Sequence, residues 1–353
     1  MNLVIYAAET LDKFTNRILI EGFNKLKINA KRGNFEFELE PNSDAVIYQL
    51  HGAPQAESDD ILIMNLIKQA LSDKSDIRKK VIMIHRPDEI KKFTEVKGFF
   101  SESVNNFGFV NYGDNHINDD FFSSENMIKK VIPHGFSSKI RNIPKKDKPI
   151  IIGSHTSWGE MRSLEHAFTL IGEVFNRYRG EKTILGYVGG KPVELLKIPS
   201  LEKKYKKIFD DYQIKLKDAN QFDIDNSTNE KNVILINQEN SELSYYNPSF
   251  NLQMYYLGDR IRTGESSGTI YRSISIPVIF EMNGSIDDLR TIKVPYTDVN
   301  NIKSIDLPSG AKKIVEVIQD DSYVEMLNHN LQQAKAWNEK HIAKEYLELL
   351  NEL

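Results

Sequence analysis

The stretch of sequence that decides the fold is residues 241–280, SELSYYNPSFNLQMYYLGDRIRTGESSGTIYRSISIPVIF. It predicts a short helix, a buried strand, the turn Glu265-Ser266-Ser267-Gly268, a helix, and a strand that Pro277 opens. A helix beginning at such a turn presents free backbone N–H groups and a partial positive charge, which suit an anion such as a diphosphate. The carboxylate of Glu265 can accept hydrogen bonds from the hydroxyls of a ribose. Doubly wound α/β folds recognise nucleotides in this way, with a helix N-terminus for the phosphates and an acidic residue for the ribose.

The rest of the chain alternates apolar strands with helices of 3.6-residue period. This alternation predicts βαβ units and mainly parallel sheets, with a linker between the two halves at 137–148. Residues at strand ends, such as His85 and, with a weaker claim, His51, should then lie at the carboxyl edge of a sheet, where ligands bind. The predicted strands are 2–7, 44–50, 79–85 and 129–136 in the first half and 149–155, 182–190 and 232–237 in the second, with helices at 14–26, 59–71 and 164–178.

Composition narrows the class of protein. A chain of 353 residues exceeds one ordinary core and predicts two domains. Its apolar content of 40% and charged content of 27% are those of a folded globular protein. No apolar run approaches the roughly 18 residues of a membrane span. The absence of cysteine excludes disulfides and thiolate chemistry, and the start MNLVIYAAET has no signal-peptide pattern, so we expect a cytoplasmic protein.

Charge argues against a nucleic-acid partner, because such proteins are usually basic and the net charge here is −4. Residues 129–148 are a local exception with seven Lys or Arg. This basic segment has two interpretations: a face toward an anionic membrane or lipid-phosphate acceptor, or a solvated connection between domains.

The order of these features resembles the C-terminal half of GT-B glycosyltransferases, in particular the retaining nucleotide-sugar glycosyltransferase family 4. The resemblance rests on Leu243, Tyr246, Asn247, Glu265, Ser266, Gly268, Pro277 and Val278. One departure is that Ser273 stands where the family has a second glutamate. The resemblance implies two Rossmann-like domains facing a cleft: 1–140 on the acceptor side, 150–321 binding the nucleotide-sugar, and 322–353 as one helix crossing back to the first domain.

The resemblance also implies roles for individual residues. Arg162 is one member of the family's basic pair that grips the donor diphosphate, and His155 stands roughly in the place of the other. Gly153, Thr156 and Ser157 belong to the same loop, whose alternative role is to cap the next helix. His85 resembles a histidine beside the donor sugar, although a strand-end histidine satisfied by local backbone fits the sequence equally well. The resemblance also marks three further positions: His134 in a Pro-x-Gly turn, Gly189 before the base-binding region, and Asn237. A tight turn or a plain strand end is the alternative explanation for each of them.

The implied activity is transfer of a sugar from a nucleotide-diphosphate donor to a hydroxyl of a glycan, lipid-linked or protein acceptor. His85, Arg162 and Glu265 are the candidate catalytic residues, and residues 265–268 complete the donor site. No cofactor or metal is expected: Asp223-Ile224-Asp225 spells an acidic metal-binding triplet but lacks a preceding strand. Two alternatives stay open, a non-catalytic GT-B-like subunit that binds a sugar or a partner transferase, and a nucleotide-sugar epimerase.

Overall fold

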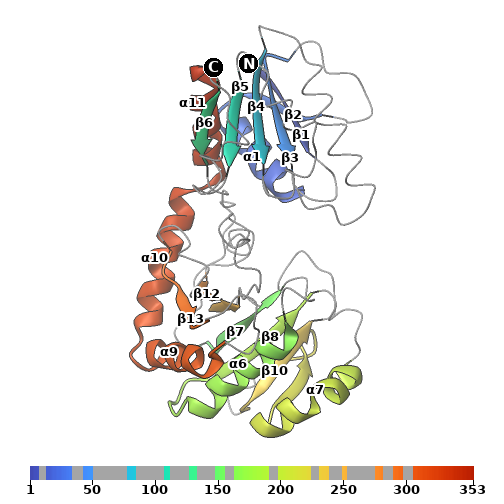
Figure 1. The fold of residues 1–353 in the computed structure, drawn as a ribbon, viewed down its shortest axis with the longest axis vertical. Coiled ribbons are helices and arrows are strands. Elements are labelled where there is room, and N and C mark those ends of the chain that lie inside the picture. Colours follow the sequence, from blue (N-terminus) through green and yellow to red (C-terminus); the bar gives the residue numbers. More distant parts are fainter. Residues whose placement is uncertain are drawn as a thin grey trace. The chain divides into compact units, whose positions relative to one another are not determined.

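The computed structural model describes residues 1–7, 13–33, 43–50, 78–84, 107–111, 127–132, 148–155, 163–190, 198–223, 230–237, 249–252, 275–280, 289–296 and 305–353. These residues form two compact units. Unit 1 holds the described residues of 1–138 and 335–353, and unit 2 holds those of 139–334. Figure 1 shows that each unit contains its own sheet.

Unit 1 is built on a sheet in which every described pair of strands is parallel, with the order β2-β1-β3-β4-β5-β6. Its central strands are continuous apolar runs, as expected for a parallel sheet buried on both faces. The edge strand β2 is instead mostly exposed. The strands are β1 (Asn2–Ala7), β2 (Asn29–Arg32), β3 (Ala45–Leu50), β4 (Lys79–Ile84), β5 (Phe107–Asn111) and β6 (Ile128–Val131).

Two helices from opposite ends of the chain share one face of this sheet: α1 (Lys13–Lys25) and α11 (Glu339–Glu352). Ile5 and Ile47 from the strands pack with Phe23 of α1 and Tyr346 of α11 in one apolar core. The two helices approach so closely that a Cβ on Gly22 would lie 2.0 Å from the carbonyl oxygen of Glu339. Glycine at position 22 therefore sets the distance between α1 and α11.

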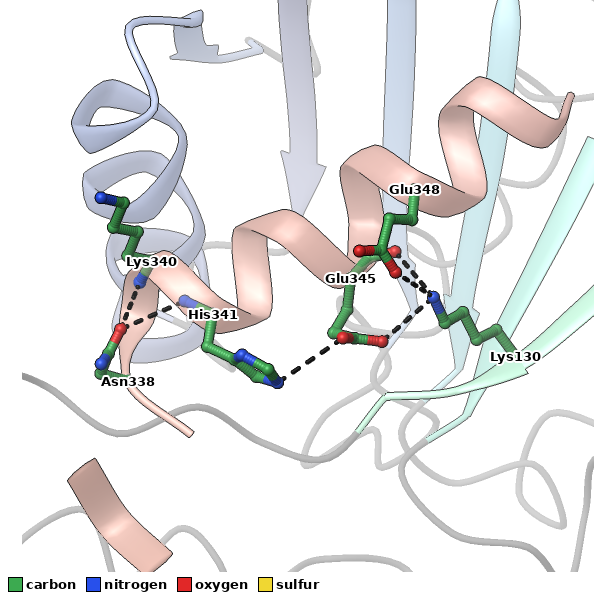
Figure 2. Close-up of polar contacts among 6 residues, drawn as sticks. All are labelled: Lys130, Asn338, Lys340, His341, Glu345 and Glu348. Atoms are coloured by element: carbon green, nitrogen blue, oxygen red, sulfur yellow. Dashed lines mark hydrogen bonds and ion pairs between the residues drawn. The ribbon is translucent and has the colours of Figure 1, made fainter. Parts of the chain in front are cut away.

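Polar contacts also hold α11 on unit 1 (Figure 2). Lys130, on β6, lies 3.0 Å from a carboxylate oxygen of Glu345 and 3.2 Å from one of Glu348. Burial alone would lower the pKa of Lys130, but the bonds with the two glutamates outweigh it and raise the pKa. On the other flank the buried Glu339 carboxylate pairs with Lys25 of α1. Lys130 belongs to the basic segment 129–148, and its ammonium group pairs with glutamates of α11.

The tail differs from its prediction as one helix over 322–353. It consists of α10 (Ser322–Ala336) and α11, separated at Trp337-Asn338. The side-chain oxygen of Asn338 accepts hydrogen bonds from the N–H groups of Lys340 (3.0 Å) and His341 (3.1 Å), which starts a new helix (Figure 2). The apolar stripe consequently serves two cores: Leu327 packs in unit 2 and Ile342 in unit 1.

Unit 2 contains a larger sheet, also parallel in every described pair, with the order β13-β12-β11-β7-β8-β10-β9. Helices α6 (Leu164–Arg177), α7 (Ile198–Tyr212) and α9 (Leu307–Gln319) share one apolar core with it, and α6 lies between the other two (Figure 1). The strands are β7 (Ile150–His155), β8 (Ile184–Gly189), β9 (Lys215–Asp218), β10 (Val233–Asn237), β11 (Phe250–Leu252), β12 (Ile276–Phe280) and β13 (Ile292–Val294).

One side chain of α10 fixes the start of the two strands at the β13 side of this sheet. The buried Asn330 amide accepts a hydrogen bond from the N–H of Arg290 (2.8 Å). It donates to the carbonyl oxygens of Arg290 (3.0 Å) and Ser275 (2.9 Å). Asn330 thus supplies hydrogen-bond partners to residues that precede β12 and β13.

Candidate functional site

The last residues of three adjacent strands form one row at the carboxyl edge of the unit 2 sheet. His155 ends β7, Gly189 ends β8 and Asn237 ends β10, and the strand register pairs Gly189 with both of the others. The structure therefore brings together Gly189 and Asn237, which the sequence marks as candidates 48 positions apart. The backbone position of His155 completes the row.

This row lies beside the topological switch point of unit 2. The chain places β8 on one side of β7 and later returns to place β11 on its other side. In open parallel sheets, ligands bind outside the carboxyl ends of strands at such a point, because the connecting loops diverge there and leave room. The geometry of unit 2 thus favours a ligand at the ends of β7, β8 and β11.

Two glycines near the carboxyl edge of this sheet are explained by backbone conformation and by packing. Gly190, directly after β8, has a φ of 94°, a conformation that side chains rarely adopt. A Cβ on Gly153 would lie 1.8 Å from the carbonyl oxygen of Tyr187 in the neighbouring strand. Gly153 is therefore required by packing between β7 and β8, whether or not a ligand approaches it.

A buried hydrogen bond orients the Asn237 side chain. Its amide nitrogen donates to the hydroxyl of Tyr187 over 3.4 Å, and both residues are fully buried. Tyr187 was not a candidate in the sequence, because a tyrosine within an apolar strand has the same pattern as a core residue. The side-chain amide nitrogen of Asn237 is therefore engaged within the sheet.

Helix α6 begins after the loop that follows β7. The hydroxyl of Ser163 caps it by accepting a hydrogen bond from the N–H of His166 at 3.4 Å. Burial lowers the pKa of His166, against the opposing effect of Glu165, so the imidazole is neutral at pH 7. The partial positive charge at this end of α6 consequently comes from the helix backbone.

Two polar side chains that sequence reasoning missed lie buried near the switch points. Ser154, next to the end of β7, is fully buried, and within the described residues its hydroxyl has no hydrogen-bond partner. Gln49, next to the end of β3 in unit 1, is 2% exposed. Within the described residues, neither polar atom of its amide has a hydrogen-bond partner. In the sequence, the only sign that Ser154 or Gln49 is unusual is that a polar residue stands in an otherwise apolar strand.

The remaining candidates lie outside the described residues: His51, His85, His134, Thr156, Ser157, Arg162, Glu265, Ser266, Ser267, Gly268 and Ser273. Their roles stay predictions. Over the part of the chain that the structure describes, no group of three or more metal-ligating side chains is present. No described helix is both long and apolar enough to cross a membrane.

Comparison with known proteins gives structural neighbours only. Neither a family model nor a curated protein sequence matches the chain. The fold is similar to Anabaena Alr3699/HepE in complex with UDP and glucose (TM-score 0.56, 9% identity, 100% of both chains). It is similar to the E. coli trehalose-6-phosphate protein bound with UDP-2-fluoro glucose (TM-score 0.60, 9% identity, 100% of this chain and 99% of that one).

A third neighbour is larger. It is the pneumococcal O-GlcNAc transferase GtfA in complex with UDP and GlcNAc (TM-score 0.51, 12% identity), of which the similarity covers 56%, against 87% of this chain. At these identities the likeness concerns the fold alone. All three neighbours are GT-B proteins, and each matches a large part of both units. The GT-B fold expected from the sequence is therefore confirmed: this chain has the GT-B fold.

Proposed function

We propose that the protein transfers a sugar from a nucleoside-diphosphate donor to an acceptor hydroxyl. The observation that carries the proposal is the row of strand ends at the switch point of unit 2, within a fold shared with proteins that bind UDP or a UDP-sugar. A ligand of this kind needs an edge where backbone groups reach the base and a helix N-terminus near the diphosphate. The ends of β8 and β10 are proposed as the edge that meets the base, and the helix N-terminus is proposed at 266–268, outside the described residues.

Within this proposal, unit 2 recognises the donor in three parts. Gly189 and Asn237 present backbone groups to the base, and Glu265 binds the ribose. The diphosphate is held by Arg162, whose planar fork suits phosphate oxygens, and by the backbone N–H groups of 266–268. Thr156 and Ser157 follow β7 in the sequence and would support the same group. Gly153, expected in the same loop, lies instead within β7.

The catalytic effect would be electrostatic. Negative charge grows on the leaving diphosphate as the sugar becomes oxocarbenium-like, and Arg162 with the helix N-terminus would stabilise that charge without a metal ion. His85 would orient the donor sugar. Retention of configuration and membership of glycosyltransferase family 4 belong to the proposal and derive from the resemblance of 243–278 to that family.

The acceptor is proposed as a glycan, a lipid-linked molecule or a protein, met in the cytoplasm or at the inner face of the membrane. A peripheral membrane contact would depend on the basic residues of 129–148. Lys130 does not contribute to it, because Glu345 and Glu348 engage its ammonium group.

A donor-turnover assay tests the proposal against its alternatives. A transferase incubated with UDP-glucose releases UDP and passes glucose to an acceptor or, slowly, to water. A non-catalytic subunit, which the serine at position 273 favours, would bind the donor and release nothing. An epimerase would change the configuration of the sugar. Release of UDP with unchanged sugar configuration supports the proposal, and either other result contradicts it.

Glu265→Gln should weaken donor binding while leaving the fold intact. Glutamine keeps the shape of glutamate but offers one acceptor oxygen instead of two, so a ribose diol loses a charge-assisted hydrogen bond. We expect a loss of roughly 1.5–3 kcal/mol in UDP affinity by isothermal titration, with an unchanged melting temperature. If Glu265 serves only the dipole of the next helix, stability falls by about 0.3–1 kcal/mol and affinity does not change.

A further inference from the structure

Gln49 of β3 carries a buried side-chain amide. It is 2% exposed, and over the described part of the chain neither Nε2 nor Oε1 has a hydrogen-bond partner. Such groups are uncommon in folded proteins, because burying an amide without hydrogen bonds costs free energy. An amide of this kind is a candidate for a ligand contact.

The position of Gln49 gives the first support for such a contact. Strand β3 lies next to β1, and the strand order of unit 1 changes direction between them, since β2 lies on the other side of β1. Gln49 is the penultimate residue of β3, paired with Ala7 at the end of β1 and with Met83 in β4. The orphaned amide therefore lies beside the switch point of unit 1, where a parallel sheet binds ligands.

The described side chains on the same face of β3 as Gln49 are apolar. Alternation along β3 puts Gln49 on the face of Ala45 and Ile47, which pack in the apolar core with α1 and α11. A second buried amide in the same sheet shows the contrast. Asn111, at the end of β5, donates its Nδ2 to the carbonyl oxygen of Ile84 over 2.8 Å. Within the described residues, the sheet thus satisfies one strand-end amide and leaves the other without a hydrogen-bond partner.

We propose that Gln49 binds a hydroxyl of the acceptor substrate and so selects an uncharged, hydroxyl-bearing ligand such as a sugar. The inference rests on the proposed function, because glycosyl transfer requires an acceptor hydroxyl. A primary amide has both donor N–H groups and an acceptor oxygen, and a hydroxyl can be hydrogen-bonded by both kinds. A site with an unsatisfied buried amide rejects ligands that lack the matching group, because they leave the amide unpaired.

The proposal predicts opposite effects of Gln49→Met on stability and on binding. Methionine keeps the length and volume of glutamine and removes the buried polar atoms, so the melting temperature of the ligand-free chain should rise by about 2 °C or more. The thermal shift that a sugar causes should be lost, with affinity at least tenfold weaker. Glucose, galactose, mannose and N-acetylglucosamine serve as probes, each with UDP present.

Two controls make the outcome unambiguous. Gln332→Met removes an exposed amide on α10 and should change neither quantity. The shift caused by UDP alone should be the same in Gln49→Met as in the natural chain, and its absence from both would contradict the proposed function without touching Gln49. A lowered melting temperature in Gln49→Met would show that the amide is satisfied structurally and overturn the inference. So would an unchanged sugar shift, or a natural chain that responds to none of the four sugars.

Discussion

Gly22→Ala is expected to destabilise unit 1, although alanine is the better helix former. Alanine in a helix interior normally stabilises by about 1 kcal/mol relative to glycine. Here the new Cβ would lie 2.0 Å from the carbonyl oxygen of Glu339 and 2.9 Å from the Cβ of Ala343, so α11 must move away from α1. We expect a net loss of roughly 2 kcal/mol in the free energy of unfolding, measured by urea denaturation. Amide hydrogen exchange in α11 should accelerate most.

Gly108→Ala is the matched control for this change. Its Cβ would also meet α11, but the contacts are with the side chain of Leu349 at 3.1–3.3 Å, which can shift slightly. Its effect should be clearly smaller. If Gly22→Ala stabilises the protein as helix propensity alone predicts, the close approach of α1 and α11 is wrong.

Asn330→Ala should have an effect of similar size on unit 2. The change removes three hydrogen bonds and leaves the Arg290 N–H and the carbonyl oxygens of Arg290 and Ser275 without this partner. A buried polar group left unsatisfied costs about 1–3 kcal/mol. The bond to Ser275 is buried and the two to Arg290 are part-buried, so we expect a loss of roughly 3 kcal/mol in unfolding free energy. Asn328→Ala changes the same residue type at an exposed position of the same helix and should cost little. Equal effects of the two substitutions would contradict the role of Asn330.

Most of the parallel strands could be predicted from apolar runs, whereas the polar edge strands β2 and β9 and the buried strand β5 could not. β1, β3, β4, β7, β8, β10 and β12 coincide with predicted strands within two residues, because strands buried on both faces have a continuous apolar pattern. β2 (NAKR) and β9 (KLKD) do not, since an edge strand needs a buried side chain only where it meets the core. Helix α7 buries Leu201, Tyr205 and Phe209 at spacings of four, but its many lysines hid this stripe.

In the C-terminal tail, the long apolar stripe favoured the prediction of one helix over the local signal for a helix start at Asn338. The stripe from Leu327 to Leu349 fits one helix, and this favoured an uninterrupted prediction. Asn338 followed by Glu339 is nevertheless a helix-start signal, and in the structure it begins α11. The break lets each part of the stripe face a different core.

The candidate site also has features that the sequence could predict and features that it could not. The row of Gly189 and Asn237 follows from the rule that parallel strands end at one edge, so sequence order alone suffices to predict it. The orphaned amide of Gln49 and the hydrogen bond between Tyr187 and Asn237 could not be predicted. Both depend on which atoms meet across neighbouring strands, and this is decided by packing rather than by residue pattern.

Nucleoside-diphosphate binding in the presence of EDTA tests the central claim most directly. A ligand that binds the folded chain at 100 times its dissociation constant stabilises it by about 2.7 kcal/mol, which a thermal melt detects. We predict that UDP or GDP raises the melting temperature without divalent metal, and that the bare nucleoside does so much less, because the diphosphate meets Arg162 and the helix N-terminus. If no nucleoside diphosphate shifts the transition at millimolar concentration, unit 2 does not hold a donor site and the proposed function is wrong.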